Sequence, residues 1–129
     1  MKIKYVHLTS QALLPCLSPF KPFKAVVISD DQVPVQRRVE ISEWLVESGC
    51  LYMMAWGNQC RRWDESVDIA NLQAFDYGEI PEDKLVMTTW HDDEPLREVF
   101  WFTKHASHHA TVIMENCVLL HLAAVSREG

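Results

Sequence analysis

A histidine followed by three carboxylates, His91 and residues 92–94, is the stretch of this chain best suited to chemistry. It follows the apolar residues 85–87, which predict a buried strand. It precedes Pro95, a residue typical of a helix start. In open α/β sheets, ligands bind outside the carboxyl ends of the strands. The sequence therefore predicts that residues 88–96 form a strand-to-helix corner at which any site would lie.

Carboxylates at different strand ends suggest one chemical hypothesis for this corner. Asp30 follows another apolar run, and carboxylates that converge from two strand ends can bind a hard cation through oxygen ligands. The chain would then be a small enzyme or ligand-binding domain that depends on magnesium or another divalent cation. Asp30 and Asp92 would be its metal ligands, and His91, Asp92 and Asp30 its candidate acid, base or ligand groups.

The alternative hypothesis gives these carboxylates a structural role. Asp92, Asp93 and Glu94 would complement the positive end of the helix that follows Pro95, and the chain would need no metal. No glycine-rich phosphate-binding sequence follows any predicted strand, which disfavours nucleotide cofactors. Cys60 and His91 form a nucleophile and base pair only if the chain brings them together, whereas a buried Cys60 would be inert.

Two tryptophans end two of the predicted strands in the same way. Trp56 and Trp90 each stand three residues after a methionine, Met53 and Met87. If the two strands are neighbours, the tryptophans are expected to flank one crevice and to offer a stacking surface. The alternative is that both rings cover the end of the core, which is the common use of tryptophan.

The charge of the chain is strongly asymmetric. Residues 64–94 contain ten carboxylates and one base, Lys84, whereas the remainder has eight acids and eleven bases. Such a field repels nucleic acid and anionic lipid and attracts a basic protein. It favours an interaction module that resembles small acidic immunity proteins in charge and size alone. The candidate binding residues are Trp56, Asp64, Asp68, Trp90, His91, Asp92, Asp93 and Glu94.

The order of apolar runs and periodic patterns predicts a single wound α/β domain over residues 1–129. We expect a largely parallel sheet of about four to six strands with three helices. The apolar stretch 111–124 is expected to form a C-terminal hairpin or bent strand, and residues 1–23 an edge strand and an irregular connection. In the first helix, Val35, Val39, Ser42 and Val46 are predicted to share one face, and Gly49 to end the helix.

Composition supports a soluble cytoplasmic protein. The chain is 48% hydrophobic and 23% charged, and it contains neither a membrane-length apolar run nor an apolar leader. Its four cysteines lack the spacing of a zinc site and are expected to be reduced.

Three motifs resemble a family of small, uncharacterised bacterial proteins: Tyr-Met-Met-Ala-Trp-Gly at residues 52–57, Trp-Asp-Glu-Ser-Val-Asp at 63–68, and Val-Met-Thr-Thr-Trp-His-Asp-Asp-Glu-Pro-Leu at 86–96. The likeness covers roughly residues 24–122. It implies one domain and a bacterial origin, and it brings no activity with it.

The enzyme and interaction hypotheses require different geometries. An enzyme needs Asp30, Asp64, His91 and Asp92 to converge on one concavity, whereas a binding face needs its acids spread outward. We favour the interaction module, because capping a helix accounts for only a few of the ten carboxylates.

Overall fold

Five parallel strands form one sheet in the order β1-β5-β2-β3-β4. The computed structural model describes residues 1–124. Its strands are β1 (Lys2–Leu8), β2 (Phe23–Ser29), β3 (Cys50–Gly57), β4 (Met87–His91) and β5 (Asn116–Leu122). Its α-helices are α1 (Val35–Ser48), α2 (Cys60–Ala74) and α3 (Leu96–His105), and two short 3₁₀ turns are η1 (Ser18–Phe20) and η2 (Glu82–Lys84). The expected single α/β domain with a parallel sheet and three helices is confirmed.

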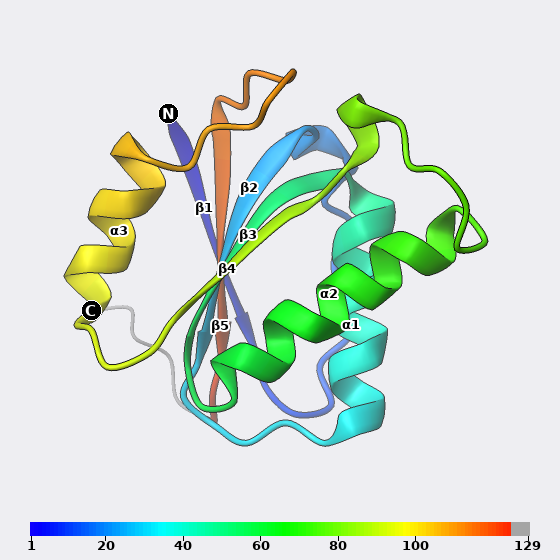
Figure 1. Cartoon of the computed structure of the whole chain (residues 1–129). Coiled ribbons are helices and arrows are strands. Elements are labelled where there is room, and N and C mark those ends of the chain that lie inside the picture. Colours follow the sequence, from blue (N-terminus) through cyan, green and yellow to red (C-terminus); the bar gives the residue numbers. More distant parts are fainter. Residues whose placement is uncertain (125–129) are drawn as a thin grey trace.

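The strand order explains why the helices lie on both faces. The chain moves across the sheet in one direction from β1 to β4 and then returns to β5. Because crossovers between parallel strands are right-handed, the return must pass over the opposite face. Figure 1 shows this arrangement, with α1 and α2 on one face and α3 on the other. We call these the α1/α2 face and the α3 face.

The central strands are buried on both faces. Every residue of β2 is buried, as its continuous apolar run predicts. Alternate residues pack in opposite directions: Val27 contacts the cluster under α1 and α2, whereas Val26 contacts the cluster under α3. The core therefore consists of two layers separated by the sheet.

The edge strands behave differently. The predicted edge strand near the N-terminus is β1, which pairs with β5 on one side, and residues 9–22 cross the sheet with η1 as their only regular element. β4 is the opposite edge. The strand there extends to His91, so residues 88–91 belong to the strand and not to the predicted corner. Parallel pairing with β3 begins at Met87 and continues to His91, so the strand is shifted along the chain from the predicted residues 85–87. Leu85 precedes the strand and, like Met87, is exposed and not buried as predicted.

Helix α1 begins after Pro34 and ends at Gly49, whose φ of 101° is the predicted left-handed C-cap. The predicted inward face of α1 is correct at Ser42, which is buried, and at Val46, which is partly buried against the core, but it is wrong at two positions. Val35 and Val39 are exposed, and the helix buries Arg38, Ile41, Ser42 and Leu45. No helix in residues 1–124 is both long and apolar enough to cross a membrane.

Candidate functional site

A buried histidine joins three strands near the carboxyl edge of the sheet. His121 Nε2 lies 2.5 Å from Oδ2 of Asp30, which directly follows β2, and His121 Nδ1 lies 2.6 Å from the Tyr5 hydroxyl on β1. His7 is in register with His121, and the centres of the two rings are 5.5 Å apart. The Nε2 of His7 donates to the Ala123 carbonyl at 2.7 Å. These contacts connect β1, β5 and the end of β2.

The order of these groups resembles the constellation of a general base. In neutral His121, Nε2–H donates to Asp30 and Nδ1 accepts the Tyr5 proton, so the carboxylate orients an imidazole that faces a hydroxyl. His121 is fully buried, however, and only its partners Asp30 and Tyr5 are partly exposed. Both ring nitrogens of the buried His121 therefore have hydrogen-bond partners, and the network holds three strands together.

Sequence reasoning named Asp30 but missed His121. The signal was a single histidine near the end of an otherwise apolar strand, with Tyr5 and His7 two residues apart on another predicted strand. A buried imidazole needs partners for both nitrogens, and those neighbours supply one of them. Strand order, which the sequence did not reveal, was needed to connect them.

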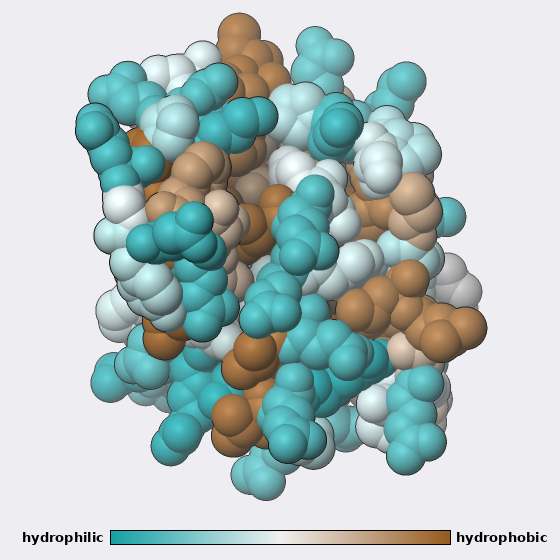
Figure 2. Space-filling model, turned by 90° about the vertical axis from the view of Figure 1, so that its right-hand side faces the viewer, coloured by the Kyte–Doolittle hydropathy of each residue, from teal (hydrophilic) through white to brown (hydrophobic). Residues whose placement is uncertain are grey.

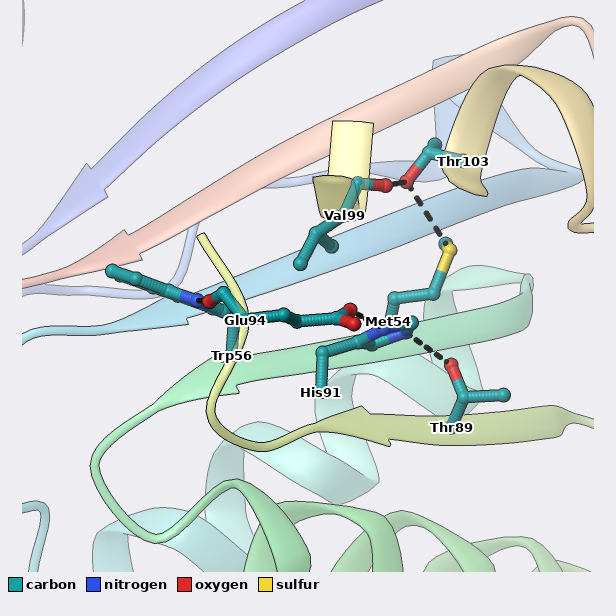
Figure 3. A network of polar contacts seen from close by, with 7 residues as sticks. All are labelled: Met54, Trp56, Thr89, His91, Glu94, Val99 and Thr103. Carbon is teal, nitrogen blue, oxygen red and sulfur yellow. Dashed lines mark hydrogen bonds and ion pairs between the residues drawn. The ribbon is translucent and has the colours of Figure 1, made fainter. Parts of the chain in front are cut away.

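A second polar cluster closes the end of β4 on the α3 face (Figure 3). His91 contacts the Glu94 carboxylate through Nδ1 and Thr89 Oγ1 through Nε2, the latter at 2.8 Å. Trp56 Nε1 donates to the Glu94 carbonyl at 2.7 Å, and the Phe102 ring meets His91 edge-on at 4.9 Å. Both ring nitrogens of His91 therefore have partners within residues 89–94.

Polar contacts of Thr103, further along α3, attach this helix to the sheet. Thr103 Oγ1 donates to the Val99 carbonyl at 2.7 Å and lies 3.3 Å from Met54 Sδ, as Figure 3 shows. Lys24 donates from Nζ to the Thr103 carbonyl at 3.0 Å, near the negative end of the helix. Burial lowers the pKa of this lysine.

On the α1/α2 face, two carboxylates of α2 share one hydroxyl. Thr88 Oγ1 lies 2.8 Å from Asp64 Oδ1 and 2.7 Å from Asp68 Oδ1. Because a hydroxyl has one proton, it donates to only one of them at a time. Burial, and secondarily the charge of Asp64, raises the pKa of Asp68, and the Thr88 hydrogen bond opposes that shift. Asp64 itself is buried, so this predicted binding residue lies beneath the surface.

The expectation that Trp56 and Trp90 flank one crevice is wrong. The pairing of β3 with β4 sets Trp56 opposite His91 and Trp90 opposite Ala55, one residue out of step. Side chains alternate along a strand, so this offset turns the two rings to opposite faces. Trp56 packs on the α3 face, whereas Trp90 lies beside Arg61 of α2, whose guanidinium is 5.7 Å from the ring centre.

The residues predicted to act as acid, base and metal ligands also do not converge on one site. Asp30 contacts His121, His91 contacts Glu94 on the α3 face, and exposed Asp92 lies 3.7 Å from Arg61. Within residues 1–124, no group of three or more His, Cys, Asp or Glu side chains is placed to hold a metal ion. The structure therefore gives no support to a metal site built from Asp30 and Asp92.

The nucleophile and base pair also fails. Cys60 packs in the cluster under α1 and α2, on the face opposite to the His91 ring. Burial, together with the nearby charge of Asp92, raises the pKa of Cys60 and disfavours the reactive thiolate.

Two cavities in the described part of the chain lie away from the predicted crevice. A pocket of about 530 Å³ lies at the amino ends of β2 and β3, where its wall includes Lys21, Cys50 and Phe75. Beside the carboxyl ends of β1 and β5, a hollow of 70 Å³ is bordered by Asp31 and Arg37. The smaller hollow lies far below the size typical of a ligand site, about 300–1,000 Å³.

Comparison with known proteins identifies a family and no relative of known activity. A family model described as a domain of unknown function, DUF7684, matches residues 3–129. Neither a curated protein nor a solved structure matches the chain.

Proposed function

We propose that this chain, which belongs to the DUF7684 family, binds a basic protein partner through an acidic face. Eight of the ten carboxylates in residues 64–94 are exposed, and this observation carries the proposal. They lie on α2, on the loop before β4 and on the turn after it. The acidic face consists of Glu65, Asp68, Asp76, Glu79, Glu82, Asp83, Asp92 and Asp93.

The charge of this face is neutralised very little within the chain. Among the residues that the structure describes, only Asp92 of the eight forms an ion pair, with exposed Arg61 at 3.7 Å. A pair of this kind contributes about 0–1 kcal/mol, because water screens both charges. The remaining carboxylates repel one another, and a basic partner would relieve that repulsion.

Apolar side chains between the carboxylates favour a protein as the partner. Ile69, Leu72, Tyr77 and Trp90 are exposed between 38% and 64%. Figure 2, which views the side of the molecule formed by α1 and α2, shows apolar patches between hydrophilic side chains. Interfaces between proteins combine such anchors with a polar rim, whereas a small cation needs no apolar contact. The same charge disfavours nucleic acid and anionic lipid.

Binding kinetics with a captured and purified partner test this proposal. Association should be fast at low ionic strength and slow steeply as salt is added, because steering acts on the association rate. The triple variant Asp68→Lys, Asp92→Lys and Asp93→Lys should reduce that rate by at least tenfold. Asp64 is left unchanged, because a lysine at that buried position would destabilise the fold.

A matched variant separates the effect of the acidic face on association from the effect of the net charge. Glu43→Lys, Glu47→Lys and Glu115→Lys together change the charge by the same amount at exposed positions outside the acidic face. This variant should retain most of the association rate. Equal effects of the two variants, or an association rate that salt does not change, would show that the acidic face is only a solvated surface.

A further inference from the structure

We infer that the free edge of β4 receives an extended basic segment of the partner, which adds to the sheet as a further strand. The inference rests on the proposed function and specifies how the acidic face binds. Strand addition supplies affinity through backbone hydrogen bonds and specificity through alternate side chains.

The sheet topology provides the first argument. β4 pairs with β3 along one side and is the last strand of the sheet, and no other described strand pairs with it. Alternate residues of an edge strand direct their backbone N–H and C=O groups away from the sheet. Residues 87–91 therefore present a short edge with which no other described strand pairs.

Charge around this edge provides the second argument. Exposed Glu82 and Asp83 precede the strand, and exposed Asp92 and Asp93 follow it. Asp68 lies beside the strand, where it contacts Thr88. Carboxylates at both ends of β4 and beside Thr88 match a strand that carries basic residues along its length.

The two edges of the sheet differ in a way that selects β4. At the opposite edge, β1 carries exposed Lys2 and Lys4. Lysines on an edge strand are a common protection against further pairing, and they repel a basic segment directly. β4 contains no lysine or arginine, so a basic strand has one favourable edge to join.

Trp90 provides an anchor at this edge. Its side chain is 47% exposed on the α1/α2 side of the strand, next to Arg61 of α2. Met87, which is 37% exposed, stands three residues earlier on the same strand. Alternation therefore offers an added strand apolar contacts on both sides of the sheet.

A pair of synthetic peptides tests the inference. The first peptide has about nine residues, a length that spans β4 and its flanks. Lysine alternates with valine in its sequence, and each end carries one additional lysine. The second is identical in sequence but N-methylated at alternate residues, which removes strand hydrogen bonds and keeps the charge. We expect the unmodified peptide to bind at least tenfold more tightly, and to slow hydrogen exchange of amides in residues 87–91.

Two protein variants supply matched controls. Trp90→Ala should weaken binding of the unmodified peptide at least fivefold. Trp101→Ala, at an exposed tryptophan of α3, should leave this binding unchanged. Equal binding of both peptides would overturn strand addition, whereas the proposal that the acidic face binds a basic partner would stand. Failure of both peptides to bind would also overturn it, and the proposed function would still be decided by the salt dependence of the captured partner.

Discussion

His121 and Asp30, which are 91 residues apart in the sequence, meet at 2.5 Å near the carboxyl edge of the sheet. The contact links the last strand of the chain to the end of β2, and the Tyr5 hydroxyl links His121 to β1. We expect His121→Ala to lower the free energy of unfolding by about 2–4 kcal/mol, because it leaves a cavity and removes a hydrogen-bond partner from each neighbour. Urea denaturation measures this change.

His108 provides the control for that substitution. It is exposed, and its ring Nε2 lies 3.0 Å from the nearby His105 carbonyl oxygen. His108→Ala should change the free energy of unfolding by less than about 0.5 kcal/mol. Similar losses for the two histidines would contradict the role assigned to the network.

The fold was predictable from sequence because its signals are local. The continuous apolar run of β2 and the glycine that ends α1 each specify an element without reference to the rest of the chain. The inward face of α1 was less accessible. Val35 and Val39 fit the helical period as well as Ile41 and Leu45 do, and only packing against α2 and the sheet distinguishes the two faces.

The candidate site was less predictable because it depends on register and strand order. A shift of one residue between β3 and β4 turns Trp56 and Trp90 to opposite faces. His121 gains its partners only because β5 lies between β1 and β2. Hydrophobic pattern alone determines neither property.

The different environments of Trp56 and Trp90 predict different costs of truncation. Trp56 is half-buried, packs on the α3 face and donates to the Glu94 carbonyl. Trp56→Ala should lower the free energy of unfolding by about 2–4 kcal/mol, and Trp90→Ala by less than about 1 kcal/mol. Chemical denaturation of both variants checks the difference, and a larger loss for Trp90 would show that it is not a surface anchor.

Gly57 is expected to tolerate no side chain. Its φ is 96°, and an added Cβ would lie 2.3 Å from the Ser29 carbonyl oxygen at the end of β2. Gly57→Ala should lower the free energy of unfolding by more than about 2 kcal/mol. At Gly78, where the nearest atom would be 3.2 Å away, the same change should cost less than about 1 kcal/mol. Thermal and urea unfolding compare the two variants, and equal losses would contradict this account.

Asp68 should make stability depend on pH in a defined direction. Burial and the neighbouring Asp64 raise the pKa of this carboxyl in the folded protein, so the folded state binds its proton more tightly than the unfolded state does. Its contribution to the free energy of unfolding therefore falls as pH rises from the unfolded value of about 3.9 to the raised folded value. Asp68→Asn lacks this titration. Relative to the unmodified protein, the variant should gain about a few tenths of a kcal/mol across that interval, a small amount because water screens the exposed part of the Asp68 side chain.

Urea denaturation between pH 3 and pH 8 measures this difference, and Asp83→Asn controls for the loss of one negative charge from the same segment. Any effect of Asp68→Asn on the Thr88 hydrogen bond that does not involve a proton is constant with pH, so the slope isolates the titration. A stability difference that does not change with pH, or one in which the variant gains stability as the solution becomes more acidic, would show that the pKa of Asp68 is not raised in the folded protein.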